Sequence, residues 1–138
     1  MQQTLSTPTT ASSFSFLRNT LLANAIFSTL SGLLFTFDAK AVDNFLGTGM
    51  PNVILVLGIG ILLFAAEVFW ISTRPQINRT AAQVVTAFDI AWVVGSWVLL
   101  LTTLVSFSAA GWWATALVAD IVAIFAICEV IGLKKAAA

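Results

Sequence analysis

Residues 52–71 read NVILVLGIGILLFAAEVFWI, a run of twenty residues with one charged side chain, Glu67. A helix rises about 1.5 Å per residue, so about twenty apolar residues cross the ~30 Å hydrocarbon core of a bilayer. A helix of a soluble protein would carry a polar face toward water, and this stretch has none. The stretch therefore predicts a transmembrane helix.

Three further apolar runs of similar length lie at about residues 17–37, 82–105 and 113–133. Together with residues 52–71 they predict an all-α fold, a four-transmembrane-helix antiparallel bundle that forms a single domain over residues 16–135. The composition agrees, since 59% of the 138 residues are hydrophobic and only 9% are charged, against about 25% charged in soluble domains. The formal net charge is zero, so no field favours nucleic acid as a partner.

The basic residues predict how the bundle sits in the membrane. Residues 1–15 are rich in Ser and Thr and nearly uncharged, which favours a flexible cytoplasmic tail. Four crossings return the chain to the side on which it started. Five basic residues then share one face, Arg18, Arg74, Arg79, Lys134 and Lys135, while only Lys40 falls on the other. The positive-inside rule therefore predicts cytoplasmic N- and C-termini, in a bacterial-type inner or plasma membrane.

The connection between the first two predicted spans has its own pattern. Ala41, Val42, Phe45 and Leu46 share one helical face, with Asp43 and its neighbour on the opposite side. This spacing predicts a short interfacial helix on the outer surface. The Gly- and Pro-containing segment 47–51 that follows would end it.

The residue types that are missing restrict the chemistry. The chain has no His and no Tyr, and its single cysteine is Cys128. Histidine is the commonest metal ligand and general base, and one cysteine makes neither an internal disulfide nor a cysteine-rich metal site. The sequence therefore predicts no catalytic residue, no metal site and no cofactor, and it favours a protein that is not an enzyme.

Several polar residues interrupt the predicted spans, often seven residues apart. The candidates for a polar interior or a ligand site are Asn24, Ser28, Asp89, Trp92, Ser96 and Asp120. Asp120 lies roughly 5 Å from the midpoint of its helix, and no Lys or Arg is encoded at that depth. An ionised Asp at the bilayer centre costs about 3 kcal/mol. Three roles are therefore open for Asp120: a protonated carboxyl hydrogen-bonded to a Ser, Thr or Asn, a carboxyl exposed to a water-filled cavity, or a group that coordinates something external.

Two other acidic residues lie closer to the predicted cytoplasmic surface. The sequence predicts cytoplasmic-side ion pairs between Glu67 and Glu129 and the long basic side chains of Arg18, Arg74 and Lys134, which can reach toward the interface. Glu129 follows Asp120 by nine residues, so the two carboxyls point to nearly opposite sides of one helix.

The first half of the chain carries a family resemblance. Ser31-Gly32-Leu33-Leu34 lies in the first span, the outer amphipathic segment ends in Phe45-Leu46-Gly47, and Gly58 and Gly60 lie in the second span. In these features the layout resembles the DoxX-like small four-helix membrane proteins. The resemblance implies a fold more than an activity, because many members of the group are uncharacterised.

Three hypotheses for function remain. The first is a non-enzymatic binding or scaffold bundle, whose polar interior holds a lipid-like or isoprenoid ligand or partner helices, alone or as a homo-oligomer. The second is an accessory subunit of a larger respiratory or photosynthetic membrane complex. The third is a small proton- or ion-coupled transporter that uses membrane carboxylates. Small multidrug resistance transporters share that layout but carry their key Glu in the first helix, where this chain has Asn24.

Overall fold

The computed structural model describes the backbone of residues 2–137 and the side chains of residues 14–136. The described residues form five helices and no strand: α1 (Gln2–Phe37), α2 (Ala39–Leu46), α3 (Pro51–Ser72), α4 (Arg79–Leu101) and α5 (Ala109–Ala137). Within this part of the chain four segments are long and apolar enough to cross a membrane, namely Phe14–Phe37, Pro51–Thr73, Arg79–Leu101 and Ala109–Ala136. The predicted all-α fold with four spans is confirmed, and the chain is a membrane protein.

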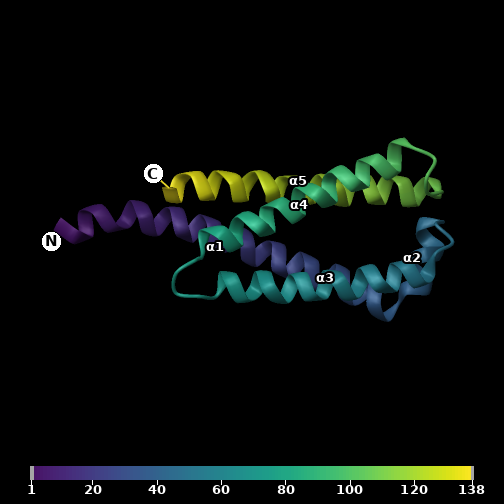
Figure 1. Ribbon diagram of the computed structural model, residues 1–138, viewed down its shortest axis with the longest axis horizontal. Helices are drawn as coiled ribbons and strands as arrows, with labels where there is room; N and C mark the ends of the chain where they lie inside the picture. The colour runs from purple at the N-terminus through teal and green to yellow at the C-terminus, as the bar shows by residue number, and fades with distance from the viewer. Residues whose placement is uncertain (1, 138) are drawn as a thin grey trace.

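The four long helices form a bundle in which each contacts two of the others, and α3 meets α4 over a short stretch where the ring centroids of Phe64 and Phe88 lie 6.2 Å apart. α1 lies along α3 on one side and against α5 on the other, α5 lies along α4, and α3 and α4 touch only briefly. Figure 1 shows α4 crossing the others obliquely, and it places both termini at the same end of the molecule. Short α2 lies at the opposite end, where it contacts α3 and α5.

Glycines allow α1 and α3 to approach closely. A Cβ added to Gly32 would lie 2.8 Å from the side chain of Leu62, and one added to Gly58 would lie 2.7 Å from the backbone nitrogen of Thr36. Small residues four apart form strips on three helices. The strips on α1 (Ser28 and Gly32) and α5 (Ala119 and Ala123) are buried or half-buried. The strip on α4, Ala87, Ala91 and Gly95, is exposed on the outside of the molecule.

Local hydrogen bonds shift the helix ends from their predicted positions. α4 begins at Arg79 because the side chain of Asn78 caps it by accepting from the backbone N–H of Ala81, at 3.1 Å. It ends at Leu101, short of the predicted residue 105, and the indole N–H of Trp112 donates to the carbonyl oxygen of Leu100 at 3.0 Å. A side-chain donor thus satisfies one of the carbonyls that a helix end leaves free.

The N-terminal segment that was predicted as a tail is helical in the structure. α1 begins at Gln2, so residues 2–15 continue the helix of the first span. Extending an existing helix adds one hydrogen bond for each residue fixed and avoids the cost of nucleation, which hydropathy does not report. The predicted membrane span still begins only at Phe14.

The two ends of the bundle are tied by different groups. At the end that holds the termini, the guanidinium of Arg18 donates to the carbonyl oxygens of Ser72, Arg74 and Pro75, at 2.5, 2.7 and 3.2 Å. At the other end, α2 terminates at Gly47, whose φ of 75° is the left-handed conformation that glycine adopts readily. The backbone nitrogen of Ser108, just before α5, donates to the carbonyl of Leu46 at 2.7 Å.

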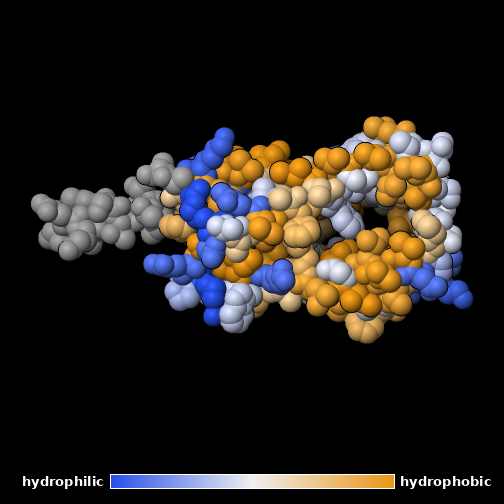
Figure 2. Space-filling model, in the orientation of Figure 1, coloured by the Kyte–Doolittle hydropathy of each residue, from blue (hydrophilic) through white to orange (hydrophobic). Residues whose placement is uncertain are grey.

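The surface reflects the bilayer as solvent. In Figure 2 hydrophilic residues gather near the terminal end, and hydrophobic residues cover most of the length beyond it. The same view shows a hollow toward the α2 end, between the half of the molecule made by α4 and α5 and the half made by α1 and α3. This hollow faces sideways, where lipid would surround the protein.

Candidate functional site: a buried acidic cluster

Three of the long helices bring their polar side chains together inside the bundle. The side-chain nitrogen of Asn24 on α1 donates to a carboxyl oxygen of Asp89 on α4 at 2.7 Å and to one of Glu129 on α5 at 2.9 Å. The hydroxyl of Ser28 donates to the side-chain oxygen of Asn24 at 3.1 Å. The hydroxyl oxygen of Thr86 lies 3.0 Å from the other carboxyl oxygen of Glu129. These five residues are called the acidic cluster below.

The acidic cluster is shielded from its surroundings. Glu129 is 0% exposed, Asn24 1% and Asp89 4%. Each side chain belongs to the buried stripe of its helix, beside small or aliphatic residues such as Ala25, Ala126 and Val85. The cluster is therefore enclosed by protein, and an amide with two hydrogens bridges two carboxyl groups within it.

The hydrogens of the acidic cluster can be counted. The Thr86 hydroxyl has one hydrogen, and its oxygen lies 3.0 Å from the carbonyl oxygen of Ala82 as well as from Glu129. A carbonyl can only accept, whereas a protonated carboxyl can donate. A proton on Glu129 would therefore satisfy both contacts, because the Thr86 hydroxyl would donate to Ala82 and accept from Glu129.

The structure assembles three of the six predicted interior residues. Asn24, Ser28 and Asp89 meet in the acidic cluster. Ser96 is buried on α4, seven residues along from Asp89, but no hydrogen bond joins it to the cluster within the described residues. Trp92 is half-buried, and its indole nitrogen is buried without a hydrogen-bond partner among the described side chains.

The structure turns the two carboxyls of α5 to different surroundings. The nine-residue spacing does place them on opposite sides, but Asp120 is exposed on the outside while Glu129 is completely buried. Depth along a helix sets how costly a charge is, and it does not set which face turns inward. The inward face of α5 follows Ala119, Val122 and Ala126, and Glu129 continues that row.

The predicted cytoplasmic-side ion pairs take another form. Glu129 bonds to Asn24 and Thr86 instead of to a basic side chain, and Glu67 is exposed on α3. Arg18 donates to the backbone carbonyls that end α3, as described above. Arg74 stacks on the ring of Trp70, and its guanidinium carbon lies 3.8 Å from the ring centroid. Lys134 is exposed in the last turn of α5.

Thr86 is the member of the acidic cluster that sequence reasoning missed. It precedes Asp89 by three residues, so the two share a helix face. The three-residue spacing from Asp89 could have identified Thr86 from the sequence. A threonine in a membrane helix, however, often only bonds to the carbonyl four residues earlier, as Thr86 also does with Ala82.

The composition of the acidic cluster limits its chemistry. Its contacting atoms are carboxyl, amide and hydroxyl groups, and no Lys or Arg is among its hydrogen-bond partners in the part of the chain that the structure describes. Two buried carboxyl groups that lie close together without a neighbouring cation favour binding a proton, because two negative charges would repel each other there. Oxygen-only ligands also suit a hard cation. Ionisable groups inside a membrane commonly mark ion or proton sites.

Comparison of the chain with protein-family models, curated proteins and solved structures gives no match. The argument for function therefore rests on the acidic cluster and its surroundings.

Proposed function

We propose that the protein is a small non-enzymatic membrane bundle whose acidic cluster binds a proton and exchanges it for an alkali-metal cation. The observation that carries the proposal is the Asn24 amide, which bridges Asp89 and Glu129 at 2.7 and 2.9 Å in a fully buried setting. Two ionised carboxylates at this place would repel each other and lose their hydration, so the cluster carries a proton.

The position of the Thr86 hydroxyl, 3.0 Å from both the Ala82 carbonyl oxygen and Glu129, favours Glu129 as the group that carries this proton. The two amide hydrogens of Asn24 then serve one oxygen of each carboxyl group. Loss of the proton would leave oxygen atoms from Asp89, Glu129 and Thr86 converging from two helices, α4 and α5. A sodium or potassium ion would find there the oxygen ligands that hard cations prefer.

The lateral hollow supports a route to the acidic cluster. It opens toward the α2 end, between the two halves of the molecule (Figure 2). Trp92 and Ser96 lie about one and two turns from Asp89 along α4, on the side of the α2 end. The buried indole N–H of Trp92 offers an unused donor in this region. A lipid-like or isoprenoid ligand entering from the bilayer is the second candidate that this opening favours.

The exchange can be measured directly as proton release. The full-length protein in weakly buffered detergent solution, with a pH-sensitive dye, should release protons when sodium or potassium chloride is added. Choline chloride at equal concentration controls for ionic strength. We expect release from the wild type and none from the double variant Asp89→Asn, Glu129→Gln, whose neutral side chains keep the shape of the originals.

Two matched variants complete the test. Asp120→Asn and Glu67→Gln also remove one carboxyl each, but from the exposed surface, and they should release protons as the wild type does. Equal release from the wild type and from the double variant would contradict the proposal. So would the absence of any release from the wild type.

The orientation proposed for the bundle places the basic end, with both termini, in the cytoplasm of a cell with a bacterial-type inner membrane. The support is the one-sided distribution of Arg and Lys. A cysteine at exposed Gln76, in the loop between α3 and α4, should resist a membrane-impermeant thiol reagent in intact cells. A cysteine at exposed Ala110, at the start of α5, should react. The reverse pattern would overturn the orientation.

Membership in the DoxX-like group remains a proposal. It is supported by the amphipathic α2 with its terminating Gly47 and by the close packing of Gly32 and Gly58 between α1 and α3. An accessory role in a larger respiratory or photosynthetic complex is a further candidate, favoured by the exposed carboxyls of Glu67 and Asp120 on membrane-spanning helices.

A further inference from the structure

The outward face of α5 carries a carboxyl group where lipid should be. Asp120 is exposed, eleven residues after Ala109, which places it about 16 Å into the span. Its neighbours on the same face, Leu117 and Ile124, are large exposed hydrophobic residues, as expected for contact with lipid. A carboxyl exposed to hydrocarbon at this depth is costly unless another polar group meets it.

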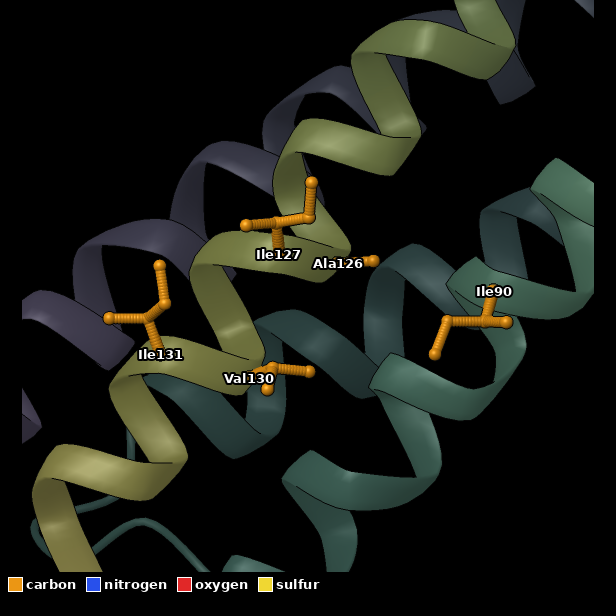
Figure 3. A pocket seen from close by; sticks show the side chains of 5 residues that line it. All are labelled: Ile90, Ala126, Ile127, Val130 and Ile131. Atoms are coloured by element: carbon orange, nitrogen blue, oxygen red, sulfur yellow. The ribbon is translucent and has the colours of Figure 1, made fainter.

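A groove lies about two helical turns from this carboxyl, on the same side of α5. Figure 3 shows aliphatic side chains from α4 and α5 lining it, and its volume is about 230 Å³. The lining residues are Ile90, Ala126, Ile127, Val130 and Ile131. Asp120 precedes Ile127 by seven residues, so the two side chains point in nearly the same direction, two turns apart. The carboxyl and the groove therefore share one face.

The adjoining surface of α4 is smooth enough for another helix to approach. Ala87, Ala91 and Gly95 are exposed there, and no atom lies within 4 Å of a Cβ added to Gly95. Small residues at such spacing let helix backbones come close in lipid. The small-residue strips on α1 and α5 are already used within the chain, whereas this one is not.

We propose that the outer face of α4 and α5 is the contact between two copies of this chain, related by a two-fold axis along the membrane normal, with Asp120 hydrogen-bonded to the partner's Asp120. Both copies insert in the same direction, because the basic residues fix the orientation. The two carboxyls then lie at the same depth. A protonated carboxyl both donates and accepts, so the pair satisfies itself across the axis.

A second copy is favoured over another protein because it brings the same carboxyl to the same depth. A two-fold contact pairs one patch with itself. The exposed Leu117 and Ile124 of one copy would then meet the same residues of the other, and the groove on this face is also lined by aliphatic side chains. A different subunit would have to supply its own polar group at the depth of Asp120. The chain itself supplies that group at the required depth.

Disulfide cross-linking in native membranes tests the contact. Cys128→Ser serves as the background, and Ile124→Cys is added on the proposed face. A matched control, Leu63→Cys, lies at a similar depth on α3 and is 66% exposed. Mild oxidation should give a disulfide-linked dimer of this chain with Ile124→Cys and little with Leu63→Cys. Equal yields from the two variants, no dimer with Ile124→Cys, or a cross-link from Ile124→Cys only to a different protein would overturn the proposal.

Energy transfer between labelled copies in lipid vesicles tests the role of Asp120. Interhelical hydrogen bonds in membranes are typically worth about 1–2 kcal/mol in model peptides, so Asp120→Leu should weaken dimerisation about 5- to 30-fold. Asp120→Asn retains a donor and an acceptor and should stay near the wild type. Dimerisation of Asp120→Leu as tight as that of the wild type would contradict pairing through Asp120. Because the acidic cluster lies on the opposite side of α5, proton release should be unchanged in either variant.

Discussion

The two faces of α5 carry the same chemical group in opposite settings. Glu129 points inward, is fully buried and is hydrogen-bonded to α1 and α4. Asp120, nine residues earlier, points outward with hydrophobic neighbours. In a soluble protein the outward carboxyl would be the ordinary one. In a membrane both need a polar partner, which Glu129 finds inside the chain and which we propose that Asp120 finds in a second copy.

Truncating the inner carboxyl should give the largest loss of stability. Glu129→Ala leaves one amide hydrogen of Asn24 and the Thr86 contact without a partner and opens a cavity. We expect a loss of about 3 kcal/mol in the free energy of unfolding. Titration with a denaturing detergent in mixed micelles measures it. The matched change on the outer face, Asp120→Ala, should stay within about 0.5 kcal/mol in micelles that hold the monomer. Equal losses in both variants would remove the contrast between the faces.

Removing the bridging amide should have the next largest effect. Asn24→Leu fills a similar volume but takes one donor from each carboxyl, so we expect a loss of about 2 kcal/mol by the same titration. Asn24→Gln keeps the amide and serves as the control. Its free energy of unfolding should lie between those of Asn24→Leu and the wild type. A stable Asn24→Leu variant would mean that the acidic cluster does not hold the three helices together.

The hydroxyl that faces Glu129 should contribute less. Thr86→Val preserves the shape of the side chain and removes one hydroxyl, which we expect to lower the free energy of unfolding by about 1 kcal/mol. Thr86→Ser retains the hydroxyl and should lie between Thr86→Val and the wild type. If Thr86→Val matched the wild type, the hydroxyl would only serve the carbonyl of Ala82.

The smallest loss of stability is expected for a substitution at Glu129 that keeps the shape of the side chain. Glu129→Gln replaces a protonated carboxyl with an amide of similar size that also donates and accepts. Its free energy of unfolding should therefore change by less than about 0.5 kcal/mol in the same micelles. A loss as large as that of Glu129→Ala would indicate that Glu129 is ionised in the folded protein.

The number and type of the helices followed from the sequence because lipid imposes a simple rule. A span such as residues 52–71 has the length and hydropathy that a bilayer requires, and α3 covers it. The interfacial α2 was predicted from four apolar residues on one face. Helix ends were less accurate, since the cap at Asn78 and the Trp112 bond to Leu100 depend on single side chains whose partners lie outside the hydrophobic pattern.

The acidic cluster was only half predictable. Asn24 and Asp89 stood out as polar residues within apolar spans, but the choice between Asp120 and Glu129 depended on which face of α5 packs inward. Lipid and protein interior are both apolar, so hydrophobic periodicity marks the inward face of a membrane helix weakly. The small residues Ala119 and Ala126, in register with Glu129, carried the better signal.

The central claim, that the acidic cluster holds a proton on Glu129, can be tested most directly by infrared spectroscopy of the protein in lipid. A protonated carboxyl absorbs apart from a carboxylate, and exchange into heavy water shifts its band. The test uses an Asp120→Asn background, which removes the other carboxyl proposed to be protonated in lipid. We predict such a band in this background, its loss when Glu129→Gln is added and its persistence when Glu67→Gln is added. A background spectrum without the band, or an unchanged band after Glu129→Gln, would contradict the account.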